Sequence, residues 1–202
     1  MQRLTALFRP VERYAAALSP ITHGLVALVS LCTFVGVIAL GFVPVTRQIE
    51  TSGYSTSDLQ AATTRAEVDT ILQAFEPVMD AVVLLSALDY LFILAGFFLF
   101  FSLHSLALHA LEAHHGLTLI PKLGMGLTVF SRLFDSLENL WVILIYSNPK
   151  DYATLLITLM NVSETVKWTL VSVEYPMLGF AIVLALLARF TPLLKRFSED
   201  LQ

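Results

Sequence analysis

Four long apolar segments constrain the fold of this chain more than any other feature of its sequence. They cover about residues 23–44, 77–108, 123–146 and 163–190. A helix that crosses a bilayer needs about 20 mainly apolar residues, and each segment meets that length. Only 14% of the residues are charged, against about 25% in a soluble domain. The sequence therefore predicts an all-α integral membrane protein, an antiparallel bundle of four transmembrane helices within residues 21–202.

Residues 1–20 have a different pattern, with apolar side chains at helical spacing and most basic side chains elsewhere. Leu4, Leu7 and Val11 illustrate the apolar face, and Arg3 and Arg9 the basic residues. This pattern is typical of a helix that lies in the membrane interface. We therefore expect an N-terminal amphipathic interfacial segment.

The distribution of basic residues predicts the orientation, because Lys and Arg near span ends favour the cytoplasmic side. The N-terminal segment, the loop at Lys122 and the tail carry most of them close to the membrane. The opposite loops carry a set of acidic residues: Glu50, Asp58, Glu67, Asp69, Glu76 and Asp151. We expect both termini to be cytoplasmic.

Local signals predict how the external loops fold. Thr64 and Glu67 form a capping-box pattern, so the second helix should begin outside the membrane and bend at Pro77. Asn148 and Pro149 predict the start of a short helix over residues 152–160. A break at residues 161–164, capped by Asn161 or Ser163, should then precede the fourth span.

Charged and amide side chains interrupt three of the four apolar segments. In the third, Arg132, Asp135, Glu138 and Asn139 are spaced three, three and one apart, which places them on one helix face. In the fourth, Glu164, Lys167 and Glu174 share a face in the same way, and the second contains Asp89.

The depths of these acidic residues are similar. Asp89 and Asp135 each lie twelve residues inside their segments, and Glu174 eleven, which is roughly 18 Å along a helix. All are therefore near the middle of a bilayer about 30 Å thick. A carboxylate that faces lipid there costs about 2.5–3.5 kcal/mol, so these side chains should face one another, the cations or water.

Four carboxylates and two cations leave an excess of acid in the predicted bundle. Either one carboxyl group is uncharged or a cation lies among them. Oxygen ligands of this kind suit Ca²⁺, Mg²⁺, Mn²⁺, Na⁺ or a proton. We therefore predict a cation or proton site formed by Asp89, Asp135, Glu138, Asn139 and Glu174, with Arg132, Lys167 and Glu164 as supporting charges.

A structural interpretation competes with this site. The same residues form a salt-bridge network if Arg132 pairs with Asp135 or Asp89 and Lys167 pairs with Glu164 or Glu174, since polar residues also hold membrane helices together. The protein would then be an accessory or scaffold subunit of a membrane complex. A lipid-modifying enzyme that uses the carboxylates as acid and base is a third, less favoured hypothesis.

Other function classes lack support in the sequence. A net charge of −4 gives no basic surface for nucleic acid, and a single cysteine excludes a multi-cysteine metal site. No catalytic motif is present and no cofactor other than the ion is predicted. The expected partners are the lipid bilayer and either further copies of the chain or a larger membrane complex.

Two short motifs carry a resemblance to known proteins. Leu88, Asp89 and Phe92 give an L-D-x-x-F pattern in one span, and Asp135, Glu138 and Asn139 give D-x-x-E-N in the next. The chain in this respect resembles uncharacterised small bacterial four-span membrane proteins over about residues 81–190. The resemblance implies a four-span architecture and a shared polar seam, but no activity. We expect the protein to lie in a bacterial inner membrane. Some of those proteins have an aromatic residue where Gly96 stands here.

Overall fold

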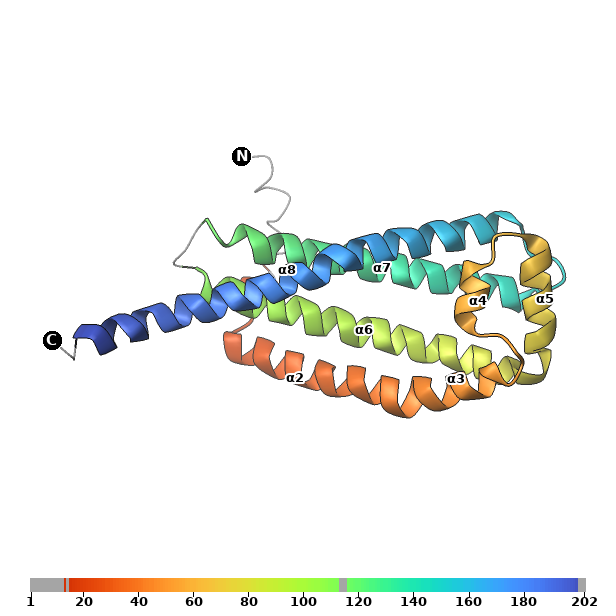
Figure 1. The fold of residues 1–202 in the computed structure, drawn as a ribbon, viewed down its shortest axis with the longest axis horizontal. Coiled ribbons are helices and arrows are strands. Elements are labelled where there is room, and N and C mark those ends of the chain that lie inside the picture. Colours follow the sequence, from red (N-terminus) through yellow and green to blue (C-terminus); the bar gives the residue numbers. More distant parts are fainter. Residues whose placement is uncertain (1–12, 14, 113–115, 200–202) are drawn as a thin grey trace. The chain divides into compact units, whose positions relative to one another are not determined.

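The computed structural model describes residue 13 and residues 15–112 and 116–199, and every regular element in these ranges is a helix (Figure 1). The chain forms two compact units, which we describe separately. Unit 1 comprises residues 1–30, 97–129 and 170–202, and unit 2 comprises residues 31–96 and 130–169. The long helices contribute residues to both units.

The described elements follow one another without strands. They are α2 (Pro20–Gly36), the π-helical segment η1 (Val37–Phe42), α3 (Val43–Glu50), α4 (Thr56–Ala61), α5 (Arg65–Phe75), the 3₁₀ turn η2 (Glu76–Val78), α6 (Met79–Ala110), α7 (Leu119–Ser147) and α8 (Leu155–Glu199).

Within the described residues, three helical stretches are long and apolar enough to cross a membrane. They are Pro20–Glu50, Arg65–Ala110 and Leu155–Phe190. The protein is thus an all-helical chain with three membrane-compatible helical stretches. The third predicted span corresponds to α7, which has 29 residues but is not among them, because Arg132, Asp135 and Glu138 interrupt its apolar sequence.

Before Pro44, the helix of the first predicted span changes from α-helical to π-helical hydrogen bonding, which reaches back five residues instead of four. Val43 donates its amide hydrogen to Ile38 O, five residues back, and residues 37–42 are π-helical. Proline has no amide hydrogen, and its ring clashes with the carbonyl four residues earlier. A short π-helical insertion accommodates this clash, so the helix continues through Pro44 into α3.

The second predicted helix begins where its capping box places it. Thr64 Oγ1 accepts a hydrogen bond from the Glu67 amide, and the Glu67 side chain accepts from the Thr64 amide. The 3₁₀ turn that contains Pro77 then separates α5 from α6. The cap and the irregularity at Pro77 are both confirmed.

The predicted break before the fourth span is wrong, because α8 runs unbroken from Leu155. Asn161 does not cap a helix; its amide donates to Ala62 O at 3.0 Å and to Ile157 O at 2.9 Å. Ser163 instead accepts a hydrogen bond from Trp141 Nε1 at 3.1 Å. These tertiary partners satisfy both side chains inside the helix, so neither terminates it.

The predicted short helix over residues 152–160 does not form a separate element, because residues 155–160 are helical but belong to α8. Asp151 donates its amide hydrogen to Asn148 O at 3.1 Å, and Asn148 Nδ2 donates to Asp151 O at 3.0 Å. Residues 148–151 therefore form a turn, and α8 begins only at Leu155.

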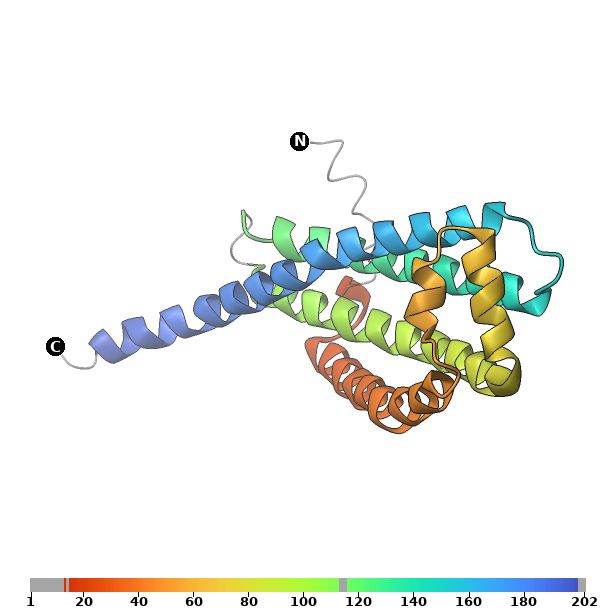
Figure 2. The same cartoon turned by 45° about the vertical axis from the view of Figure 1, so that its right-hand side comes forward.

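Unit 2 has an apolar core to which α4 and α5 contribute. Figures 1 and 2 show α4 and α5 side by side, lying across the direction of the long helices. The core residues come from α3, α4, α5, α6, α7 and α8 and from the segments that adjoin α4 and α8: Val45, Ile49, Leu59, Ala62, Val68, Ile71, Leu72, Phe75, Ala81, Val82, Val142, Ile145, Tyr152, Ile157 and Met160. The segment that contains α4 and α5 is therefore packed into this unit.

Unit 1 has a smaller apolar core, formed by Ala15, Phe101, Leu108 and Met125. A second contact in this unit is between α6 and α7, where the buried ring of His104 lies against Gly124. The predicted interfacial helix falls mostly on residues 1–12 and 14, which lie outside the described residues.

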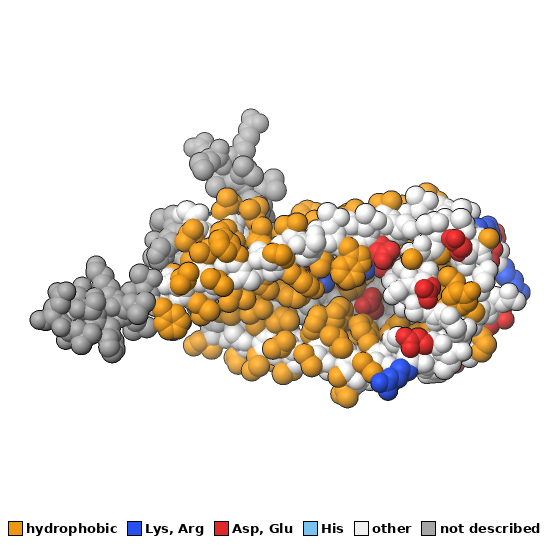
Figure 3. All heavy atoms as spheres, viewed as in Figure 1, with side chains coloured by type: hydrophobic (Ala, Val, Ile, Leu, Met, Phe, Trp, Pro, Cys, Tyr) orange, Lys and Arg blue, Asp and Glu red, His pale blue; other side chains and the backbone are white. Residues whose placement is uncertain are grey.

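The long helices expose apolar side chains, as expected for surfaces that face lipid. On the face shown in Figure 3, hydrophobic side chains cover the long helices, and charged side chains gather around α4 and α5. On α7 the exposed large apolar residues include Val129, Phe130, Leu133, Leu140 and Leu144. The polar residues of α7 must therefore lie on its other face.

Candidate functional site

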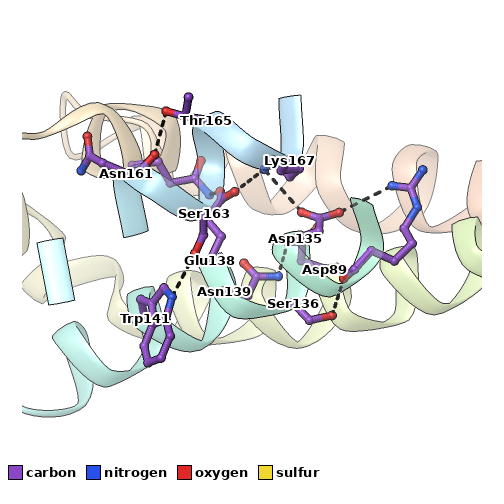
Figure 4. A network of polar contacts seen from close by, with 12 residues as sticks. Asp89, Asp135, Ser136, Glu138, Asn139, Trp141, Asn161, Ser163, Thr165 and Lys167 are labelled. Carbon is purple, nitrogen blue, oxygen red and sulfur yellow. Dashed lines mark hydrogen bonds and ion pairs between the residues drawn. The ribbon is translucent and has the colours of Figure 1, made fainter. Parts of the chain in front are cut away.

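The polar stripe of α7 is buried in unit 2, as its spacing predicts. Arg132, Asp135, Glu138 and Asn139 are each exposed by 7% or less. Asp80, on the opposite face of α6 from Asp89, is exposed. Figure 4 shows the α7 stripe facing residues of α6 and α8. We call Asp89, Arg132, Asp135, Glu138, Asn139 and Lys167 the charge cluster.

Asp135 lies between the two basic residues of the charge cluster. Its Oδ2 is 3.6 Å from Arg132 Nη1, and its Oδ1 is 3.4 Å from Lys167 Nζ. The pairing of Arg132 with Asp135 agrees with the structural alternative drawn from the sequence. Asp135 is therefore paired with two basic side chains, one on its own helix and one on α8.

Glu138 is the most buried carboxylate of the cluster, at 1% exposure. Its Oε2 lies 2.5 Å from Lys167 Nζ, and its Oε1 accepts a hydrogen bond of 2.5 Å from Gln60 Nε2. Lys167 therefore bridges Glu138 and Asp135 (Figure 4). The expected pairing of Lys167 with Glu164 is not formed, and Glu164 is half-buried on α8.

Asp89 has a different environment from the other two carboxylates. It accepts a hydrogen bond from the neutral amide of Asn139, and neither Arg132 nor Lys167 forms an ion pair with it among the described contacts. It is also partly exposed. Asp89 is thus the least buried carboxylate of the cluster, and its hydrogen-bond partner is a neutral amide.

Gly96, within the region of the resemblance, leaves room for the side chain of Arg132. A Cβ atom at Gly96 would lie 3.6 Å from Arg132 Cζ and 3.3 Å from a ring carbon of Phe34. Phe34 in turn stacks on Phe92 of the L-D-x-x-F motif, with ring centroids 4.2 Å apart. An aromatic side chain at position 96 would occupy the space of the guanidinium group, which explains why glycine suits this chain.

Glu174 belongs to unit 1, whereas the four other residues of the predicted site belong to unit 2: Asp89, Asp135, Glu138 and Asn139. It is fully buried and accepts a hydrogen bond of 2.8 Å from Thr128 Oγ1. Thr128 is also within 3.0 Å of Gly124 O. We therefore treat Glu174 as a separate buried carboxyl group.

Sequence reasoning missed Gln60 as a member of the polar network. It lies 78 residues before Glu138, and no periodicity connects the two. The only local signal is the Ser55–Asp58 capping box, which begins α4 and so orients the helix. The contact itself depends on how α4 packs on the rest of unit 2.

The chemistry available to the charge cluster follows from its partners. Three carboxylates meet two basic side chains, and Lys167 already lies between Asp135 and Glu138. Among the described residues, no group of three or more His, Cys, Asp or Glu side chains is arranged to hold a metal ion. The carboxylates of the charge cluster therefore outnumber its basic side chains by one.

Comparisons with known proteins assign no family to this arrangement. No protein-family model, curated protein or solved structure matches the chain.

Proposed function

We propose that this chain is a small four-span protein of the bacterial inner membrane, with both termini cytoplasmic, whose charge cluster binds an exchangeable proton or a monovalent cation. Transport, permeation or ion-dependent sensing would use this exchange. The fourth span is α7, whose apolar residues are exposed and whose charged residues are buried. This distribution of side chains is expected of a helix that turns one face to lipid and the other to the interior of a helical bundle.

The hydrogen bond between Asn139 and Asp89 carries the proposal. An amide has both donors and an acceptor, so Asn139 can serve an ionised Asp89 through Nδ2 and a protonated Asp89 through Oδ1. A lysine or arginine partner would favour the ionised form alone. Asp89 is therefore the exchange group, whereas Asp135 and Glu138 are paired with Arg132 and Lys167.

The test is the dependence of thermal stability on pH and on Na⁺ for purified protein in lipid nanodiscs. A ligand that binds only the folded state stabilises it by about 2.7 kcal/mol at a hundred times its Kd. We expect the melting temperature of the wild type to vary with pH or Na⁺ concentration. Asp89→Asn should remove that dependence, because an amide neither releases a proton nor carries the negative charge that attracts a cation.

Asp80→Asn is the matched control, because Asp80 is on the same helix but exposed. It should behave as the wild type does. If Asp89→Asn keeps the full ion and pH dependence, the proposed site is wrong. Ca²⁺ and Mg²⁺ should add no more stability than Na⁺ at equal ionic strength.

The scaffold function is the second proposal, and the Lys167 bridge favours it. One lysine that joins Asp135 and Glu138 links α8 to α7 without any exchangeable group. In this alternative the wild type and Asp89→Asn would both melt independently of Na⁺ and of pH near neutrality. The two proposals therefore predict opposite results in the same experiment.

A further inference from the structure

The short helix α4 is fixed in unit 2 by side chains on both flanks of Gln60. Leu59 is fully buried in the core and Ala62 is 5% exposed. Asn161 of α8 donates to Ala62 O at 3.0 Å, and the Ser55–Asp58 capping box fixes the first turn. Gln60 is therefore held in place from α4 and points toward the charge cluster.

Gln60 and Lys167 together occupy both oxygens of Glu138. The amide donates to Oε1 and the ammonium group lies on Oε2, each at 2.5 Å. Hydrogen bonds to ionised groups are about twice as strong as neutral ones. The contact therefore joins the external helix α4 directly to the most buried carboxylate of the cluster.

From this contact we infer that α4 is the external gate of the charge cluster and that Gln60 is its closing residue. When Gln60 releases Glu138, water and small cations reach the cluster from the α4 side. When it is bound, exchange is confined to the partly exposed Asp89. This inference gives the proposed function its route of access, and its biological meaning depends on that function.

The residue type at position 60 fits this role. The amide donates a hydrogen bond without adding charge, so it closes the cluster and leaves the excess of one carboxylate unchanged. A lysine would neutralise that excess, and a glutamate would repel Glu138. Gln60 is thus a positioning residue, and removing its donor should open the gate without altering the charge count.

The test uses a buried thiol next to the contact as a reporter. Ser163 is 4% exposed and lies two residues from Asn161, which binds the end of α4. The protein carries Ser163→Cys in a Cys32→Ser background, and a membrane-impermeant thiol reagent is added from outside to intact cells. The rate of labelling then reports how often the α4 side opens.

Gln60→Met preserves side-chain length and removes the donor. Loss of one hydrogen bond to a charged group should raise the labelling rate about ten- to a hundredfold. Ser57→Ala is the matched control, because Ser57 is exposed on the same helix, and it should leave the rate unchanged. An unchanged rate in Gln60→Met would overturn the inference.

A second measurement is independent of the cysteine. Hydrogen exchange at the buried Leu59 amide follows the local opening of α4, and it should speed up by the same factor in Gln60→Met. Every variant must first show a cooperative melt. Neither readout requires ion binding, so a failed gate and a failed exchange site at Asp89 give distinguishable results.

Discussion

At the scale of single residues, the partner of each acidic side chain decides what that side chain can do. Asp135 is paired with Lys167 and Arg132, whereas the amide of Asn139 can serve either form of Asp89. The difference is chemical, since an amide both donates and accepts while an ammonium group only donates. The spacing along each helix predicted that these residues face one another, but it did not predict which partner each carboxylate has.

Tyr152 shows the same effect outside the membrane spans. Its hydroxyl group is buried and donates to Asp69 Oδ1 at 2.7 Å. Burial, followed by the hydrogen bond and the charge of Asp69, raises the pKa of Tyr152 from its ordinary 10.0 to about 12. The neutral phenol is therefore favoured in the folded state, and this stability is fully present below pH 10.

Tyr152→Phe should lower the free energy of unfolding at neutral pH by about 1 kcal/mol, because it removes this hydrogen bond. In the wild type, the contribution of Tyr152 is lost as pH rises from about 10 to about 12. The variant should lack that part of the pH dependence in denaturant melts. Tyr175→Phe, at a 46% exposed position, should keep it; equal curves for the wild type and Tyr152→Phe would contradict this account.

At the scale of elements, two helices can approach closely where one of them has a glycine, which has no side chain. In unit 1, a Cβ atom at Gly124 of α7 would lie 2.0 Å from His104 Cε1 of α6. The imidazole ring therefore fills the space that a larger residue would need. The helix content of this region was predictable from its apolar length, but this pairing of a histidine with a glycine was not.

Gly124→Ala should destabilise the protein by about 1–3 kcal/mol, the usual cost of overpacking. Gly179→Ala is the control, because a Cβ atom there meets nothing within 4 Å. That variant should be neutral or more stable by up to about 1 kcal/mol, since alanine is the better helix former. Thermal melts of both variants measure the difference, and equal stabilities would show that His104 moves aside without cost.

At the scale of the whole molecule, the position of α7 decides the topology. By length and composition alone, α7 is not among the helices that could cross a membrane, because it contains too many charged residues. Its burial pattern, with apolar residues outside and charged residues inside, is what a bundle helix in lipid requires. The four-span proposal therefore depends on α7 crossing the bilayer.

Cysteine labelling in a Cys32→Ser background tests this topology. Ser57→Cys and Lys150→Cys should react with an impermeant reagent in intact cells, because both loops are predicted to be external. Gly116→Cys should react only after the cells are permeabilised. Labelling of Gly116→Cys and Lys150→Cys from the same side would mean that α7 does not cross the membrane.

The sequence by itself determined the helices and the faces they bury. Apolar length and spacing are local properties, so they correctly predicted an all-helical chain, the Thr64 cap and the buried stripe of α7. Tertiary structure decided the partners, because hydrogen bonds and ion pairs are chosen among groups far apart in the chain. Gln60 meets Glu138 across 78 residues, Asn161 continues a helix that its local sequence would end, and Glu174 lies in a different unit from Asp89.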